Sequence, residues 1–474
     1  MKNDMKSFFA THAWVRGAWA RDVLLTVDAS GAWSGIQANA PVTANQDVTV
    51  LNGPVLPGLV NAHSHAFQRA IAGLTERKAG AGAALRDDFW SWRDRMYSVA
   101  RRITPDQLEA IAALLYAELL AGGYTQVCEF HYLHNALDGR PYANPLEMSL
   151  ALVRAAQRVG MGLTLLPTLY MRSGFGAPGL REDQRRFAST PDSVLRLVEG
   201  VQAQAGALAH VNVGVAVHSL RAADAAAIKE VAAFAANNGL PIHIHVAEQT
   251  QEVQDCLHHT GKRPIEWLLE HLPVNAHWNL VHATHTTPEE LQAVGASGAA
   301  IVICPSTEAN LGDGVFDFSG YSGIGGRWSI GSDSHVTRSW TEELRLLEYS
   351  QRLTQRRRNV AAQAGGFDSS AAALFEAALA GGQSATARPL GAIELGHRAD
   401  FLVLNEQSSV LLGVPAEHVL DALVFSSPGA RFKEVFVAGQ QRVDGGRVWG
   451  RESGPALWPE LVQEFVRTMK TLWT

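Results

Sequence analysis

The sequence predicts an α/β fold, a (β/α)8 TIM-like barrel joined to a small β-sandwich domain built from both chain ends. Apolar strand patterns alternate with helical patterns across residues 57–389, and this alternation is typical of a barrel of parallel strands. Strand patterns without helical periodicity occupy residues 10–55 and return after residue 400. The length of 474 residues suits one large barrel with a smaller partner domain.

The two chain ends are predicted to share one domain. Their strand patterns, separated by turn residues, lie at residues 13–15, 23–27, 48–51, 401–404 and 434–437. A helix is expected from about Pro459 to the end of the chain. We therefore assign residues 1–56 and 390–474 to the composite β-sandwich domain, and residues 57–389 to the barrel.

Eight strands are expected in the barrel segment. The first is the apolar stretch Leu56–His65, and the others are Tyr124–Phe130, Gly162–Tyr170, Val211–Val217, Pro241–Val246, Trp278–His282, Ala299–Cys304 and Arg327–Gly331. Between and after them lie stretches of helical period, at Pro105–Ala121, Pro145–Val159, Pro191–Ala205, Ala222–Asn238, Pro264–Leu272, Pro288–Val294 and Ser369–Ala380. Several begin with a Thr-Pro start signal, such as Thr104-Pro105. The Ala- and Gly-containing stretch Arg77–Leu85 is expected to be a flexible loop.

Composition excludes several classes of protein. Hydrophobic residues at 47% and charged residues at 18% are typical of a soluble globular chain. A net charge of −6 gives no electrostatic case for nucleic acid binding. No apolar run approaches the ~18–20 residues that a membrane span needs, and no signal-peptide pattern is present. Three scattered cysteines argue against a disulfide framework, so we expect a cytoplasmic protein.

Two histidines close the first barrel strand. His63 and His65 are two residues apart, so in a strand they project from the same face, about 7 Å apart along the backbone. Neutral imidazoles held side by side suit a divalent transition metal, most often zinc. A lone His-x-His pair is more often a pair of satisfied loop histidines, so the metal reading needs matching ligands elsewhere in the chain.

Those matching residues stand at the carboxyl ends of other predicted strands, where barrels carry their functional side chains. Three histidines and a carboxylate, with a position left for water, are a common ligand set for catalytic zinc. We predict that one zinc ion is held by His63, His65, His245 and Asp333. His243 shares a strand face with His245 and is the alternative ligand. We prefer His245 because it lies at the strand end.

These residues resemble a known family. Over its whole length the chain resembles the mononuclear deaminase branch of the amidohydrolase superfamily, through Pro57–His65, His245-x-x-Glu248, His282 and Ser332-Asp333. Narrower motifs resemble the members of that branch that hydrolyse N-formimidoyl-L-glutamate in histidine breakdown: His65–Arg69, Phe89–Arg93, Glu129–Tyr132, His218–Arg221 and Ser306–Gly314. The resemblance implies N-formyl-L-glutamate and ammonia as products, one zinc ion per chain and a homodimer.

Hydrolysis of a C=N bond assigns roles to three of these residues. The reaction needs a hydroxide near neutral pH, and zinc lowers the pKa of its water to about 7. Asp333 is expected to take the proton of that water, and His282 to orient the nucleophile. Glu248, three residues after His245, is expected to protonate the imino nitrogen and the departing ammonia.

A glutamate-derived substrate is a dicarboxylate and needs cationic and hydrogen-bonding partners. The planar fork of arginine suits a carboxylate. The residues expected to bind the substrate are Gln68, Arg93, Tyr132, His218, Arg221 and Ser332. For Arg93, which lies in an aromatic stretch, simple stacking on an aromatic ring is the competing interpretation.

Two other functions stay open on the sequence alone. A deaminase of the same fold could act on a purine, pterin or triazine ring, and a neutral ring would not need Arg93 and Arg221 in the pocket. The chain could also be a barrel without catalytic activity that serves assembly or binding. The intact ligand set and Glu248 argue against this second possibility.

Overall fold

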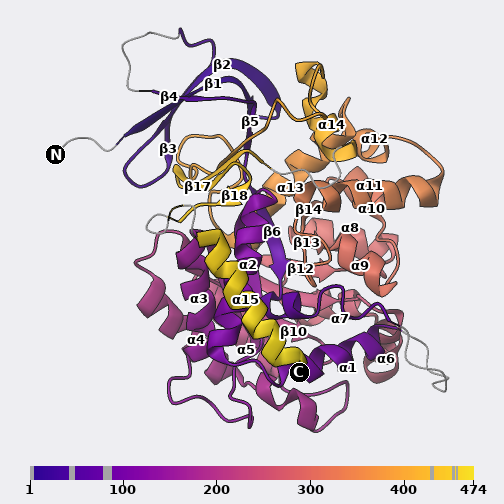
Figure 1. Cartoon of the computed structure of the whole chain (residues 1–474). Coiled ribbons are helices and arrows are strands. Elements are labelled where there is room, and N and C mark those ends of the chain that lie inside the picture. The colour runs from indigo at the N-terminus through magenta and orange to yellow at the C-terminus, as the bar shows by residue number, and fades with distance from the viewer. Residues whose placement is uncertain (1–4, 42–47, 78–87, 427–431, 451–453, 455–456) are drawn as a thin grey trace.

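The computed structural model describes residues 5–41, 48–77, 88–426, 432–450, 454 and 457–474. It contains a parallel barrel and a separate sheet built from the two chain ends (Figure 1). The expected flexible loop at residues 77–85 falls, apart from Arg77, outside the described residues. Within the described ranges, no helix has both the length and the apolar character needed to cross a lipid bilayer.

The smaller sheet joins strands that are far apart in the sequence. They are β1 (Lys6–Val15), β2 (Ala18–Val27), β3 (Trp33–Gln37), β4 (Thr49–Leu51), β5 (Val55–Pro57), β15 (Phe401–Val403), β16 (Glu434–Val437), β17 (Gln440–Asp444) and β18 (Arg447–Val448). Strands β5 and β15 pair antiparallel, so the two chain ends meet inside the sheet. Phe8 on β1 contacts Phe401 and Phe436 edge to face, although β5 separates β1 from β15. The sheet therefore folds over its own apolar core, which confirms the predicted small sandwich.

The barrel has the eight parallel strands that were predicted. They are β6 (Leu59–Ser64), β7 (Tyr124–His131), β8 (Gly162–Leu169), β10 (Val215–Ser219), β11 (Ile242–Val246), β12 (Trp278–His282), β13 (Ala300–Ile303) and β14 (Arg327–Ile330). The short β9 (Val211–Val213) pairs with β8. The predicted strand at residues 211–217 is thus interrupted at Gly214, where a Cβ atom would collide with the Pro241 carbonyl oxygen.

The first and last barrel strands meet at the carboxyl end of the barrel. A parallel bridge joins Ser64 to Asp333. The Asp333 amide donates to the His63 carbonyl at 3.0 Å, and the His65 amide donates to the Asp333 carbonyl at 3.3 Å. Three of the four residues that were predicted to bind metal, His63, His65 and Asp333, therefore take part in closing the barrel.

Helices surround the barrel (Figure 1). They are α1 (Phe89–Ala100), α2 (Pro105–Ala121), α3 (Glu147–Val159), α4 (Pro191–Ala205), α5 (Ala225–Asn237), α6 (Thr250–Thr260), α7 (Pro264–His271), α8 (Pro288–Ser297), α9 (Pro305–Leu311), α10 (Phe318–Gly323), α11 (Trp340–Gln355), α12 (Val360–Gly365), α13 (Ser370–Thr386), α14 (Val419–Phe425) and α15 (Leu457–Trp473), with the 3-10 turns η1 (Ala66–Ala70), η2 (Glu182–Phe187) and η3 (Ala416–His418). Helices α2 and α4 have the predicted bounds, because Thr104 and Thr190 cap them and proline follows each cap.

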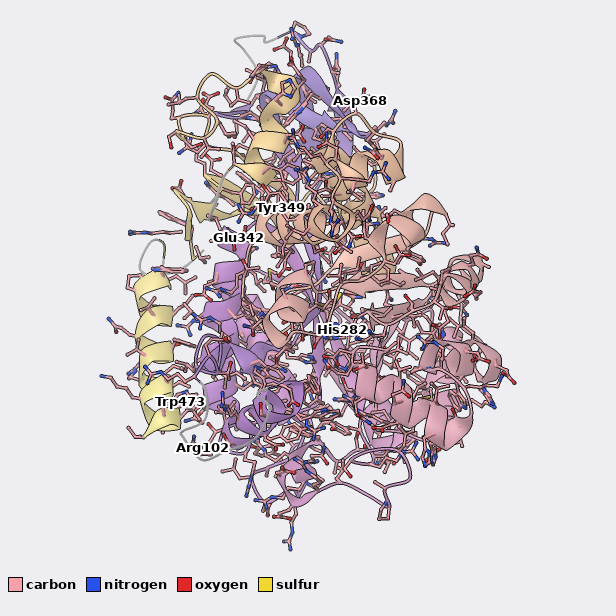
Figure 2. All side chains as sticks on the ribbon, turned by 90° about the vertical axis from the view of Figure 1, so that its right-hand side faces the viewer. Arg102, His282, Glu342, Tyr349, Asp368 and Trp473 are labelled. Carbon is pink, nitrogen blue, oxygen red and sulfur yellow. The ribbon has the colours of Figure 1, made fainter. Side chains whose placement is uncertain are left out.

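The last helix departs from the predicted domain assignment. Helix α15 belongs to residues 390–474, which we assigned to the β-sandwich domain, yet it packs along α2 on the outside of the barrel (Figures 1 and 2). Trp473, near its end, donates its indole N–H to the Ala70 carbonyl at 3.1 Å. The apolar face of α15 is the physical reason, because it needs an apolar surface to cover it.

A pair of glycines lets α13 approach the point of barrel closure. Gly381 and Gly382 are buried in the middle of this helix, which packs against β14 and β6. A Cβ atom at Gly381 would overlap the Trp328 carbonyl oxygen, and one at Gly382 would lie 2.8 Å from Val60. The close packing of α13 therefore supports the two strands that lead to Asp333 and His63.

We predict that Gly381→Ala destabilises the protein, although alanine is the better helix former by ~1 kcal/mol. Overpacking of this kind costs about 1–3 kcal/mol, which should appear as a lower free energy of unfolding in urea. Gly323→Ala is the matched control, because this helical glycine has open space where a Cβ atom would be added. A Gly381→Ala protein as stable as the Gly323→Ala protein would contradict the packing argument.

Candidate metal centre and active site

Two of the predicted ligands come from the first barrel strand and the turn after it. His63 is the fifth residue of β6, and His65 follows the end of that strand. The two rings lie edge to face with centroids 4.7 Å apart. His65 donates its Nδ1 proton to the Phe130 carbonyl at 2.9 Å, so its Nε2 carries a lone pair directed into the barrel mouth.

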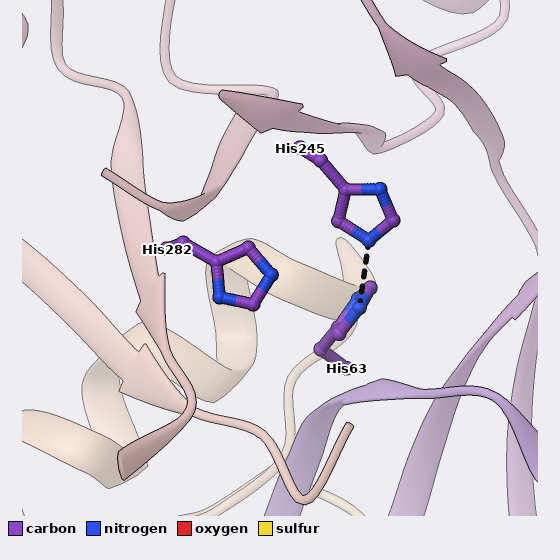
Figure 3. A group of neighbouring side chains, drawn as sticks. All are labelled: His63, His245 and His282. Carbon is purple, nitrogen blue, oxygen red and sulfur yellow. Dashed lines mark hydrogen bonds between the residues drawn. The ribbon is translucent and has the colours of Figure 1, made fainter. Parts of the chain in front are cut away.

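The other two predicted ligands reach the same point, His245 from across the barrel and Asp333 from beside the first strand. Nε2 of His245, on β11, lies 3.0 Å from Nε2 of His63 (Figure 3). Its Nδ1 donates to the His218 carbonyl at 3.0 Å, which fixes the ring orientation. Oδ1 of Asp333 lies 3.4 Å from Nε2 of His63 and 3.4 Å from Nε2 of His65. The structure thus brings all four predicted ligands together.

This donor set fits a divalent cation. Burial lowers the pKa of His63 to about 3, and burial also lowers the pKa of His65 and of His245, so the three rings are neutral near pH 7. Lone pairs of neutral imidazoles that face one another are unfavourable without a bridging proton or cation. Burial opposes ionisation of Asp333, yet its hydrogen bond with His63 and the nearby histidines lower its pKa. Three neutral nitrogens and one carboxylate are the usual ligands of catalytic zinc.

The structure separates the two histidines of β11. His243 is fully buried, and its Nε2 donates to the Ala385 carbonyl at 2.8 Å, below the metal-ligand layer. Cys304 is equally buried and groups with His282 and Glu308, not with the four predicted ligands. His282 also lies close enough to His63 and His245 to form a ligand group with them (Figure 3).

The predicted acid–base residues flank the ligand set. Nε2 of His282 lies 3.8 Å from Oε1 of Glu248. Burial raises the pKa of Glu248, although His282 and Arg221 oppose that shift, so its carboxyl is suited to hold a proton. Burial alone would lower the pKa of His282, but the charges of Glu248, Asp333 and Glu308 outweigh it and raise the pKa to about 10.

Strained backbone presents these groups at the strand ends. His282, Asp333 and Ala247, which precedes Glu248, have φ of 72°, 41° and 54°. Residues other than glycine seldom adopt this left-handed region, and they tolerate it where the surrounding structure holds them. Glu252 supplies part of that hold, because its carboxylate accepts the amides of Ala247 and Glu248, each at 3.2 Å.

The same pocket also carries cationic and polar side chains. Besides His65, His245 and Asp333 of the ligand set, it is lined by five of the predicted substrate-binding residues: Gln68, Arg93, Tyr132, His218 and Arg221. Gln68 donates to the Tyr132 hydroxyl at 3.3 Å, and its buried Oε1 has no hydrogen-bond partner among the described residues. The remaining wall is apolar and aromatic, with contributions from Phe89, Trp92, Met96, Tyr97 and Leu311.

The two pocket arginines differ in their surroundings. Arg221 is 7% exposed, and its Nη1 lies 3.5 Å from Oε2 of Glu252 without a hydrogen bond. Arg93, on α1, is half-buried and stacks over Trp90 at 4.4 Å. Its buried Nε likewise has no partner within the described part of the chain. Arg93 therefore stacks on an aromatic ring and also lines the pocket. Both arginines have N–H groups without a hydrogen-bond partner in the described structure, which a ligand could satisfy.

Ser332 does not reach the pocket. It is fully buried beneath the ligand layer, where its hydroxyl accepts from Asn61 at 2.7 Å and is hydrogen-bonded to His335 at 3.0 Å. Its expected contact with substrate is therefore corrected to a structural one, because both bonding directions of the hydroxyl are already used. Glu252 was not anticipated, although its position four residues after Glu248, at the start of a helix, was the available signal.

Comparison with known proteins places this geometry among related chains. The amidohydrolase family model matches residues 55–442. A formimidoylglutamate deiminase from Pseudomonas aeruginosa is 43% identical over 465 residues, which cover 98% of this chain and 100% of that protein. The crystal structure of an amidohydrolase from Brucella melitensis matches with a TM-score of 0.90 at 41% identity, covering 99% of this chain and 100% of the other. An atrazine chlorohydrolase from Arthrobacter aurescens, solved in complex with zinc, shares the fold with a TM-score of 0.83 at 20% identity, covering 98% and 100%.

The geometry predicts opposite effects for the two histidines of β11. His245→Gln should lower bound metal well below that of the wild type, because it removes a converging lone pair. His243→Gln should keep its metal, because that ring contacts a backbone carbonyl. Elemental analysis after gel filtration measures both. Loss of metal from His243→Gln alone would reverse the assignment of the ligand.

Proposed function

The chain belongs to the amidohydrolase family, and from this premise we propose that it hydrolyses N-formimidoyl-L-glutamate to N-formyl-L-glutamate and ammonia, the deimination step of histidine breakdown. The similarity to the formimidoylglutamate deiminase from Pseudomonas aeruginosa supports this substrate. The reaction is the replacement of a terminal C=NH group by C=O.

One observation carries the proposal, which is that the wall of a single pocket holds both carboxylates and arginines. Glu248 and Asp333 line this pocket beside the predicted metal ligands, and Arg93 and Arg221 line it as well. The proposed substrate also carries groups of both signs, because its free amidine is cationic near neutral pH and its glutamate part carries two carboxylates. Arginine can bind a carboxylate through two parallel hydrogen bonds, which are stronger than neutral ones.

His63, His65, His245 and Asp333 would hold one zinc ion per chain. A zinc ion bound there supplies the acidity that makes a hydroxide nucleophile available near neutral pH. The fit of the neutral, buried donor set described above supports this choice of metal ligands. The carboxylate of Asp333, which lies beside the histidine nitrogens, is placed to accept the proton of the attacking water.

Glu248 and His282 complete the proton transfers. The amidine gives one N–H proton to Glu248 as it binds, and Glu248 returns this proton to the imino nitrogen as the water oxygen bonds to the amidine carbon. The result is a tetrahedral carbon with one OH and one NH2 group. His282, beside Glu248, donates from Nε2 to the oxygen at that carbon. The hydroxyl proton then passes through the carboxylates to nitrogen, ammonia leaves, and the C=O bond forms. The apolar wall excludes other water from the pocket.

The pocket disfavours the two rival functions. A neutral purine, pterin or triazine would leave the buried Nη1 group of Arg221 without a carboxylate acceptor from the ligand, and a buried donor left without a partner costs about 1–3 kcal/mol. A barrel without catalytic activity would not need the converging ligands or the buried Glu248. Ammonia release measured on N-formimidoyl-L-glutamate and on a panel of ring amines tests the proposal directly, and preference for a ring amine would overturn it.

We predict that Glu248→Gln keeps its metal and loses most turnover. The carboxamide preserves the shape of the side chain but cannot deliver a proton, and general acid–base groups contribute ~10²–10⁴-fold. Metal content and the rate of ammonia release measured on one preparation check both parts. Turnover close to that of the wild type would assign Glu248 a structural role.

We predict that Arg221→Met lowers kcat/KM for N-formimidoyl-L-glutamate by orders of magnitude, with unchanged zinc content. The substitution removes a carboxylate partner and also the positioning that it gives, so kcat should fall together with binding. Arg196→Met is the matched control, because that arginine is exposed on α4 and does not line the pocket. Equal kinetics for the two variants would show that Arg221 does not recognise the substrate.

A further inference from the structure

The motif Ser306-Thr307-Glu308 has no part in the scheme above, yet it lies directly behind the acid–base residues. The three residues form the first turn of α9, after β13. All of them are polar and buried, with exposures of 5%, 0% and 4%. Buried polar side chains in a barrel wall need partners, and their partners indicate what the motif does.

Glu308 contacts the back of the His282 ring. Its Oε1 accepts the Cys304 amide at 2.9 Å and lies 3.3 Å from Nδ1 of His282. A carboxylate only accepts hydrogen bonds when ionised, so Nδ1 of His282 must carry the proton. The other ring nitrogen, Nε2, then faces Glu248 at 3.8 Å. The hydrogen bond at one imidazole nitrogen sets what the other nitrogen can do.

The backbone of His282 gives the ring little support of its own. His282 has a φ of 72° and Ala283 a φ of 51°, so the strand ends in two consecutive left-handed residues. Such a conformation persists only where surrounding contacts hold it. The bond to Glu308 is the polar side-chain contact that reaches Nδ1 of His282 in the described structure.

The other two residues of the motif anchor it to neighbouring elements. Thr307 is hydrogen-bonded to the Ser334 hydroxyl at 2.9 Å and accepts the Ser334 amide at 3.2 Å, next to Asp333. Ser306 donates its hydroxyl to Glu343 of α11 at 2.6 Å, and Glu343 also accepts the Ser306 amide at 2.9 Å. Glu308 is therefore held on a turn that is tied on one side to the segment after β14 and on the other side to α11.

We propose that Glu308 is a positioning residue whose hydrogen bond with Nδ1 orients the His282 ring and aims its Nε2–H at the reacting amidine. The expected effect of Glu308 on turnover rests on the proposed function, whereas its effect on the orientation of the His282 ring does not. Orienting partners behind a site commonly contribute 10–100-fold to activity. Because Glu308 does not line the pocket, its removal should change kcat and leave KM near the wild-type value.

Glu308→Gln tests the proposal, because the amide can occupy the same space without the charge. We expect kcat for N-formimidoyl-L-glutamate to fall about 10–100-fold, with metal content and KM unchanged. In a His282→Asn background the same substitution should cause no further loss, because residues that act through one another are not additive. An unchanged kcat, or an equal loss in the His282→Asn background, would overturn the proposal.

Glu348→Gln is the matched control for folding. Glu348 is a fully buried carboxylate that accepts the amides of Val360 and Ala361, each at 2.9 Å, and does not line the pocket. It should lower thermal stability without lowering kcat. An equal loss of kcat in Glu348→Gln and Glu308→Gln would assign the effect to general destabilisation and contradict the proposal.

The ring itself can be observed in the wild-type protein, which covers the case of a Glu308 variant that does not fold. Nitrogen-15 NMR of histidine-labelled metal-loaded protein, with the His282 signals assigned by comparison with His282→Asn, reports which nitrogen is protonated. We expect a protonated Nδ1. A bare Nδ1 would overturn the proposal. Because no substrate is needed, this result stays valid if the proposed reaction is wrong.

Discussion

The arrangement depends on one constraint, which is that three neutral histidines and an aspartate share a buried point where the barrel closes. His63 lies on the first strand and Asp333 follows the last strand, and the hydrogen bond between their backbones is part of the closure. Their side chains converge 3.4 Å apart in a site with almost no exposure. Lone pairs buried without partners are costly, so a bound cation would stabilise the closed barrel as well as the active site. Metal binding at this point would therefore be coupled to barrel closure through His63 and Asp333.

The second feature is that one pocket wall holds both carboxylates and arginines. Glu248 and Asp333 line the pocket, and so do Arg93 and Arg221, whose buried Nε and Nη1 atoms have no hydrogen-bond partner among the described residues. Glu252 links Glu248 to Arg221, because its carboxylate accepts the Glu248 amide and also pairs with Arg221. A substrate that contacts both arginines would satisfy donors that the protein alone leaves unpaired. The residue proposed for acid–base chemistry, Glu248, and the residue proposed for specificity, Arg221, are therefore held by the same carboxylate, that of Glu252.

Much of the architecture could be predicted from local patterns, because those patterns have local causes. The strand Trp278–His282 and the helix Pro105–Ala121 have the predicted bounds, one from its apolar run and the other from its cap and proline. The ligand set followed from the rule that barrel strands carry functional groups at their carboxyl ends.

Two kinds of feature could not be predicted: how deep in the barrel a side chain lies, and which residues far away in the sequence it contacts. His243 and His245 share a face, so only the height of each along β11 separates ligand from buried neighbour. Ser332 precedes Asp333, yet its hydroxyl is hydrogen-bonded to Asn61 and His335. Asn61 is far away in the sequence, and no local pattern predicts that the His335 side chain turns toward Ser332. Helix α15 carries a clear helical pattern, but nothing local says that it covers the barrel instead of the sandwich.

The measurement that tests the account most directly is identification of the products by proton NMR during turnover of N-formimidoyl-L-glutamate by the metal-loaded enzyme. If the amidine carbon lies at the metal end and Glu248 protonates the terminal nitrogen, the C=NH bond breaks. The spectrum should then show N-formyl-L-glutamate, with one ammonia formed for each formyl group. Formation of glutamate and formamide would mean that the other C–N bond breaks, and the proposed placement of the substrate would be wrong.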